Sequence, residues 1–133
     1  IKQVIDIMDM ESFIDNRIEN LSTGQTQRTS IARCLIHSPK IYIFDEPTLG
    51  LDVISSKSII DFMKNEKKRG KTVLYSTHYM EEAETLCDRI MMIHQGEVIA
   101  IGTPTELKEK TETDNLRDVF ITLASERGDL FED

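Results

Sequence analysis

Two short apolar runs, separated by a long amphipathic segment, constrain the fold of this chain more than any other feature. Residues 41–44 (IYIF) and 72–76 (TVLYS) are rich in β-branched and aromatic side chains, which favours two buried strands. Between them, residues 53–69 show a helical period, and Gly70 is in position to cap this helix at its C-terminus. A strand, a crossover helix and a second strand predict a parallel sheet in an α/β fold.

The segments on either side of this unit are predicted to be mostly helical. Further helices are expected over residues 1–14 (one or two short ones), 22–37, 80–87, 103–110 and 115–125. Residues 89–94 and 97–101 predict a β-hairpin around Gly96, placed at one edge of the sheet. The acidic tail 126–133 is expected to be frayed.

Composition indicates one globular domain without a membrane span. The chain has 133 residues, 39% hydrophobic and 30% charged, and no run approaches the roughly 18 apolar residues of a spanning helix. Its net charge of −8 argues against nucleic-acid binding, which needs a basic face. Cys34 and Cys87 form no CxxC pair and have apolar neighbours, so reduced core thiols are predicted rather than a disulfide or metal site.

A pair of carboxylates ends the first apolar run. Asp45 and Glu46 are therefore expected at the C-terminal edge of a strand, which is where open α/β sheets bind ligands. Asp45 could hold Mg²⁺ directly or through water, because this ion prefers oxygen ligands. Glu46 could polarise an attacking water. For this pair alone, a solvated acidic strand end is an equally good interpretation.

The stretch 21–25 (LSTGQ) precedes the helix that is expected to end near His37. Free backbone N–H groups and the positive end of a helix dipole attract a phosphate. Ser22 would add a hydroxyl donor, and Gly24 would let the backbone approach the ligand closely. Plain N-capping by Ser22 explains the same residues equally well.

His78 follows the second apolar run and is expected at the same sheet edge as the two carboxylates. An imidazole in that position could donate a hydrogen bond to a γ-phosphate. His37 and His94 have no comparable neighbours, so we expect them to be ordinary surface or core residues.

Taken in chain order, these motifs resemble those of the ATP-binding-cassette (ABC) ATPases. The resemblance extends from the start of the chain to about residue 110. By this resemblance, Ser22, Thr23, Gly24 and Gln25 with Leu21 match the signature motif, which implies nucleotide binding. Asp45 matches the Walker B aspartate that binds Mg²⁺, and Glu46 matches the catalytic glutamate. Asp52 in LGLD matches the D-loop aspartate, and His78 matches the catalytic switch histidine. Thr23 departs from the family, which usually has glycine at that position.

The sequence contains no G-x-x-x-x-G-K-[ST] phosphate loop. In the resembled family this loop lies N-terminal to the signature motif, and the chain begins within a helical pattern at Ile1, which suggests a cut through a larger domain. The resemblance therefore implies the C-terminal part of a P-loop NTPase domain of ABC type. Within it, 1–38 would end a helical subdomain, 39–110 would belong to the catalytic core, and 111–133 would form a C-terminal helix and tail.

The family implies ATP and Mg²⁺ as cofactors and a second nucleotide-binding domain as partner, with ATP held between the two. Ser22 and Gly24 are then expected to face outward, because the ATP that they would contact belongs to the partner. Pro47-Thr48 and STHYMEEAETLCDRI (76–90) resemble transporter subunits, and GTPTEL (102–107) with NLRDVFITLAS (115–125) resemble the sodium- or drug-export branch. A transmembrane permease partner and a cytoplasmic, peripheral location at the inner face of the membrane are then expected. The alternatives are an ABC-type ATPase that acts on nucleic acid or ribosomes, and an interaction module that has lost catalysis.

Overall fold

The computed structural model describes residues 1–126, which form two compact units. The first unit comprises residues 1–77, and the second begins at His78. Most of the tail predicted to be frayed, residues 127–133, lies outside the described residues. Both units mix helices with a two-stranded sheet, so the α/β fold class predicted from the sequence is confirmed.

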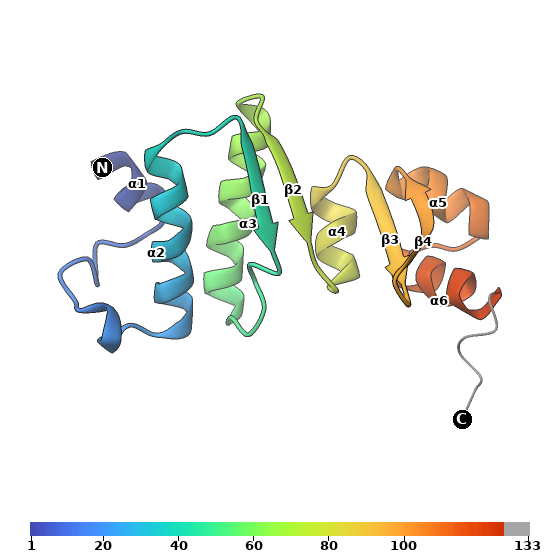
Figure 1. Ribbon diagram of the computed structural model, residues 1–133, viewed down its shortest axis with the longest axis horizontal. Helices are drawn as coiled ribbons and strands as arrows, with labels where there is room; N and C mark the ends of the chain where they lie inside the picture. Colours follow the sequence, from blue (N-terminus) through green and yellow to red (C-terminus); the bar gives the residue numbers. More distant parts are fainter. Residues whose placement is uncertain (127–133) are drawn as a thin grey trace. The chain divides into compact units, whose positions relative to one another are not determined.

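The first unit is built around two parallel strands and their crossover helix (Figure 1). Its elements, in chain order, are α1 (Lys2–Ile7), the 3₁₀ turn η1 (Ile18–Asn20), α2 (Thr23–Ile36), β1 (Ile41–Asp45), α3 (Val53–Lys68) and β2 (Thr72–Ser76). β1 and β2 pair in parallel from Ile41↔Thr72 to Asp45↔Ser76, as predicted. Arg69 ends α3, and Gly70 follows with φ +80°, a conformation that glycine adopts at little cost.

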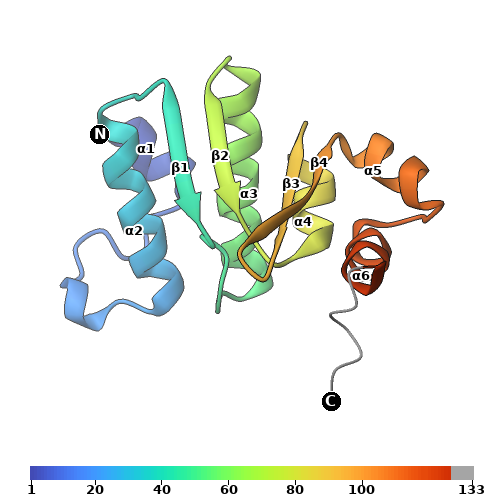
Figure 2. The ribbon, with the colours of Figure 1, turned by 45° about the vertical axis from the view of Figure 1, so that its right-hand side comes forward.

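The prediction that both strands are buried is wrong for the described residues. Ile41 is 61% exposed and Ile43 73% exposed, whereas Tyr42 and Phe44 are buried. Alternate side chains of a strand point to opposite faces, and α3 packs on only one face of the pair. In Figure 2, α3 runs along one side of β1 and β2. The strands are therefore half-buried rather than fully enclosed.

The rings of Tyr42, Phe44 and Phe62 form the aromatic centre of this unit. Phe62 of α3 meets both strand rings edge-on, with ring centroids 5.7 Å from Tyr42 and 6.3 Å from Phe44. Such edge-to-face contacts add to the stabilisation that burial provides. A second group of buried side chains joins α2 to the segment after α1: Met8, Met10, Phe13, Ile31 and Ala32.

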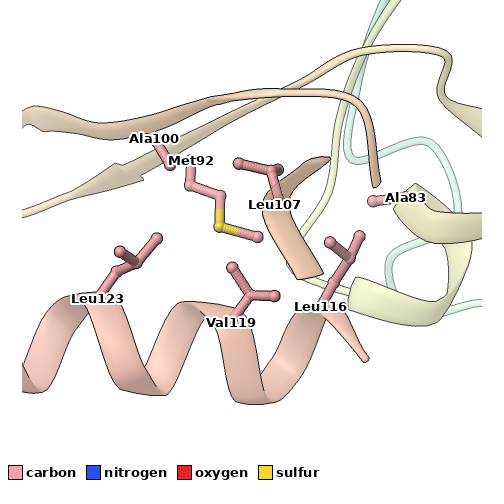
Figure 3. Packing of buried hydrophobic residues seen from close by; sticks show 7 residues of the cluster. All are labelled: Ala83, Met92, Ala100, Leu107, Leu116, Val119 and Leu123. Atoms are coloured by element: carbon pink, nitrogen blue, oxygen red, sulfur yellow. The ribbon is translucent and has the colours of Figure 1, made fainter. Parts of the chain in front are cut away.

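The second unit combines three helices with an antiparallel hairpin. It contains α4 (Met80–Leu86), β3 (Ile90–His94), β4 (Glu97–Gly102), α5 (Pro104–Thr111) and α6 (Leu116–Glu126). Figure 3 shows its core, in which side chains of α6, β3, β4, α5 and α4 meet: Leu116, Val119, Leu123, Met92, Ala100, Leu107 and Ala83. The hairpin turns at Gln95-Gly96, where both residues have positive φ. Thr103 and Glu106 form a capping box at the start of α5.

The hairpin was expected at one edge of the parallel sheet. β3 and β4 pair with each other in a two-stranded sheet, and the place of the hairpin relative to β1 and β2 stays a prediction. Another expectation needs correction. Cys34 was expected in the core, but it is exposed, because α2 turns Ile31 and Ala32 inward instead. Within residues 1–126, neither Cys34 nor Cys87 forms a disulfide. Within residues 1–126, no helix is both long and apolar enough to cross a membrane.

Candidate functional site

The C-terminal ends of β1 and β2 meet at a small polar junction. Asp45 and Ser76 are register partners there, and the Ser76 hydroxyl donates a hydrogen bond to Asp45 Oδ1. The backbone N–H of Glu46 donates to the Ser76 carbonyl oxygen at 3.0 Å and to Ser76 Oγ at 3.1 Å. Ser76 thus binds the Asp45 carboxylate and the backbone of Glu46 at one strand edge, where a parallel α/β sheet binds its ligands.

Glu46 occupies an uncommon backbone conformation. Its φ is +44°, in the left-handed region that residues other than glycine seldom adopt. The chain is fixed on both sides of it: its N–H binds Ser76, and its carbonyl oxygen accepts from the N–H of Leu49 at 3.1 Å. Pro47 and Thr48 beyond it are buried. Such strain persists where the surroundings impose it, and it is common at functional sites.

Asp45 could hold Mg²⁺ through a single carboxylate. Its exposed carboxylate has one oxygen engaged by Ser76 and lies at the strand edge. No group of three or more His, Cys, Asp or Glu side chains within residues 1–126 could hold a metal ion by itself. This donor set fits Mg²⁺ bound through one carboxylate, with water and phosphate oxygens as the other ligands. It does not fit a structural metal site made only of protein side chains.

Ser22 begins α2 with a capping box. Its Oγ accepts from the backbone N–H of Gln25 at 3.2 Å, and Gln25 Oε1 accepts from the backbone N–H of Ser22 at 3.0 Å. Capping and ligand binding are compatible here, since the Ser22 hydroxyl still has a proton to donate. Ser22 and Thr23 are exposed at the helix N-terminus, where the dipole favours an anion.

Gly24 differs from its neighbours because it is buried. The expectation that both Ser22 and Gly24 face outward is therefore wrong for Gly24. The reason is that α2 approaches the start of α3 at this point: a Cβ atom on Gly24 would lie 2.7 Å from Ser55 Oγ.

Asp52 is the N-cap of α3. Its Oδ1 accepts from the backbone N–H groups of Ile54 at 3.0 Å and Ser55 at 2.9 Å, and its Oδ2 accepts from the Ser55 hydroxyl at 2.9 Å. The hydrogen bond from the Ser55 backbone N–H lowers the pKa of Asp52 most, and the bond from the Ser55 hydroxyl lowers it further, because both stabilise the carboxylate form. Asp52 therefore stays ionised at neutral pH and caps the N-terminus of α3.

His78 is exposed at the start of the second unit, and its ring lies 4.2 Å from that of Tyr79. That His78 lies at the same sheet edge as Asp45 and Glu46 remains a prediction. His94 packs edge-on against Phe120 at 5.5 Å, and His37 is exposed. Both fit the ordinary structural roles expected for them.

Ser76 and Ser55 contribute to the site but were not predicted from the sequence. Ser76 could have been found from the strand register, because the last residue of β2 pairs with Asp45 when the two runs are aligned in parallel. Ser55 carries no comparable signal. Its importance comes from the contact between α2 and α3, which are far apart in sequence.

Comparison with known proteins supports the resemblance seen in the motifs. A family model described as "ABC transporter" matches residues 1–49. The ABC transporter ATP-binding protein NatA of Bacillus subtilis is 42% identical over 113 residues, covering 85% of this chain and 46% of that protein. The linearmycin resistance ATP-binding protein LnrL of the same species is 41% identical, covering 86% of this chain and 37% of that protein. The chain thus spans about half or less of the length of these relatives.

Solved structures give the same result. An ATP-binding subunit of an ABC transporter superposes with a TM-score of 0.81 at 27% identity, covering 92% of this chain and 52% of that one. A dimeric ATP-binding cassette bound to ADP and Pi, in a post-hydrolysis state, superposes with a TM-score of 0.68 at 32% identity, covering 77% and 44%. Motifs, relatives and fold agree, and the chain belongs to the family of ABC transporter ATP-binding proteins.

Proposed function

We propose that this chain is part of the ATP-binding and ATP-hydrolysing motor subunit of a membrane transporter. The observation that carries the proposal is the junction of Asp45, Glu46 and Ser76 at the C-terminal edge of two parallel strands. An oxygen ligand for Mg²⁺ and a second carboxylate on the next residue are groups that can serve phosphoryl transfer to water.

Each site residue then has a separate task. ATP with its Mg²⁺ supplies the phosphoryl group when bound. Asp45 would hold the ion, Glu46 would accept a proton from the attacking water, and His78 would donate a hydrogen bond to the γ-phosphate. The phosphate loop that holds this ATP would come from a part of the subunit outside residues 1–133, because the chain has no such sequence.

Residues 21–25, the signature turn, would bind the ATP that a second nucleotide-binding domain holds. Ser22, Thr23, Gly24 and Gln25 lie at a helix N-terminus, which favours an anion, and we assign them to the ATP of the partner domain. Asp52 would face the same interface. The existence of a dimeric ATP-binding cassette among similar structures supports such pairing.

The transporter setting follows from the relatives. Their names include linearmycin resistance and Nod factor export ATP-binding proteins, which favours an exporter of the sodium or drug type. A transmembrane permease would then be the second partner, and the subunit would work in the cytoplasm at the inner face of the membrane. We also propose that the chain consists of three parts: the end of a helical subdomain (1–38), part of a catalytic core (39–110) and a C-terminal segment (111–133).

The test is ATP-dependent pairing of the full-length subunit. Glu46→Gln should trap ATP-bound dimers by slowing hydrolysis, and Ser22→Arg in that background should abolish them, because it places bulk and charge where the partner's phosphates approach. Monomeric ATP binding should persist. Ser30→Arg is the matched control, since Ser30 is an exposed serine of the same helix two turns beyond the signature turn. If Ser22→Arg dimers form as readily as those of Glu46→Gln alone, the proposed role of residues 21–25 is refuted.

A further inference from the structure

Gly24 stands within a helix, where glycine is unfavourable. It is the second residue of α2, and its φ is not among the positive values that would require glycine. In a helix, glycine is less favourable than alanine by roughly 1 kcal/mol, because its backbone loses more freedom. The reason for glycine at this position must therefore be space.

The space is limited by the first turn of α3. A Cβ atom on Gly24 would lie 2.7 Å from Ser55 Oγ and 3.1 Å from Ser55 Cβ, and 3.9 Å from Asp52 Oδ2. The two distances to Ser55 are shorter than ordinary van der Waals contacts, whereas the distance to Asp52 is an ordinary one. The N-terminal ends of α2 and α3 therefore touch through Gly24 and Ser55.

Ser55 cannot turn aside without loss. It is 8% exposed, its backbone N–H binds Asp52 Oδ1, and its hydroxyl donates to Asp52 Oδ2. A rotation that made room for a Cβ would break the hydroxyl bond and leave a buried polar group to satisfy. Asp52, Ser55 and Gly24 thus form one contact chain from the α3 cap to the signature turn.

We propose that Gly24 is a positioning residue: through Ser55 it sets the distance between the signature turn and Asp52. This rests on the proposed function, in which both elements face the same partner domain. Close packing of α2 on α3 then presents Ser22 and Asp52 to the partner in one fixed arrangement. Gly24 is needed for contact within its own chain, in addition to any approach by the partner's phosphates.

The packing is tested in the 133-residue chain by compensation. Gly24→Ala should lower the free energy of unfolding of the first unit, and Ser55→Gly should reduce that loss because it removes both atoms that the new Cβ meets. Ser56→Gly is the matched control: it has the same helix-propensity cost one residue along, and Ser56 is not among the atoms near Gly24. A positive interaction between Gly24→Ala and Ser55→Gly, absent with Ser56→Gly, supports the contact. Strict additivity of both pairs overturns it.

The positioning role is tested in the full-length subunit with the Glu46→Gln background. Gly24→Ala should weaken ATP-dependent pairing at least about tenfold, a usual effect of overpacking a close contact, while ATP affinity of the monomer stays the same. Adding Ser55→Gly should restore most of the pairing, and adding Ser56→Gly should not. If the Gly24→Ala, Ser55→Gly protein folds but pairs as poorly as Gly24→Ala, the positioning role is wrong. Ser22→Arg distinguishes an error in the positioning role from an error in the proposed function. It tests whether the signature turn takes part in pairing at all, and it does not involve Ser55.

Discussion

The hydroxyl of Tyr42 on β1 donates a 2.8 Å hydrogen bond to the carboxylate of Glu66 on α3, and each residue is 3% exposed. Arg69 donates a second bond, at 2.8 Å, to the other oxygen of the same carboxylate. A buried charge is stable only when it is paired and hydrogen-bonded. This link joins the crossover helix to the strand that ends in Asp45 and Glu46.

We expect Tyr42→Phe to lower the free energy of unfolding of the first unit by roughly 1–3 kcal/mol, because a buried carboxylate oxygen loses its donor. Glu66→Gln keeps an acceptor for Tyr42 but removes the ion pair with Arg69. Denaturant unfolding of both single variants and the double variant measures the coupling. Additive losses would mean that the charge on Glu66 does not strengthen its hydrogen bond with Tyr42.

The same bond predicts a change of stability at alkaline pH. The pKa of Tyr42 is raised from 10.0 to about 12. Burial is the main cause, and the hydrogen bond to Glu66 is the second. Between these values the unfolded state loses the Tyr42 proton while the folded state keeps it, so the free energy of unfolding should fall as pH rises from 10 to 12. The contribution is fully present below pH 10. Unfolding followed against pH should show a shallower fall for Tyr42→Phe; equal slopes would contradict the prediction.

Arg28 of α2 holds the segment that follows α1. Its Nη1 donates to the Asp9 carbonyl at 3.0 Å, to Asp9 Oδ2 at 3.2 Å and to the Met8 carbonyl at 3.4 Å, and its guanidinium lies 5.1 Å from the centre of the Phe13 ring. Lysine cannot reproduce this combination of planar stacking and hydrogen bonds.

Arg28→Lys should therefore lower the free energy of unfolding by about 1–2 kcal/mol. Arg33→Lys is the matched control, since Arg33 is an exposed arginine of the same helix. Asp9→Asn should have a small effect, under about 1 kcal/mol, because the Asp9 side chain is 80% exposed and the carbonyl bonds remain. Equal losses for Arg28→Lys and Arg33→Lys would show that these contacts do not stabilise the unit.

Glu46→Gln in the full-length subunit should keep ATP binding but slow turnover at least ~10²-fold, as the loss of a general base usually does. The amide keeps the shape of the side chain but cannot accept the proton of water. Steady-state hydrolysis and nucleotide binding should be measured on the same preparation. Turnover near the wild-type rate would remove Glu46 from the proposed role.

The 133-residue chain by itself should hydrolyse no ATP above background. Phosphoryl transfer depends on positioning and charge stabilisation, and the chain has no G-x-x-x-x-G-K-[ST] sequence to hold the β- and γ-phosphates. Phosphate release should be followed with and without Mg²⁺, with the Glu46→Gln chain as the control for contaminating activity. Mg²⁺-dependent turnover that Glu46→Gln abolishes would contradict this prediction.

The sequence by itself determined the elements with strong local signals. β2 was predicted over 72–76 and spans Thr72–Ser76, and the helix expected from 22–24 to about His37 is α2, Thr23–Ile36. Strand composition, the Ser22 cap and the breaking residue Pro39 are properties of a few neighbouring residues, so they can be read without a fold. The order of the motifs also led to the correct family.

Only the tertiary structure decided which side of each element is covered. Ile41 and Ile43 were expected to be buried and are exposed, because α3 covers one face of β1 and β2. Gly24 was expected to face outward and is buried against Ser55, because α2 and α3 touch there. The link between Asp45, Glu46 and Ser76 depends on strand register across thirty-one residues of chain. Local patterns fix where a helix or strand begins and ends, but burial and contact depend on segments distant in sequence that pack against it.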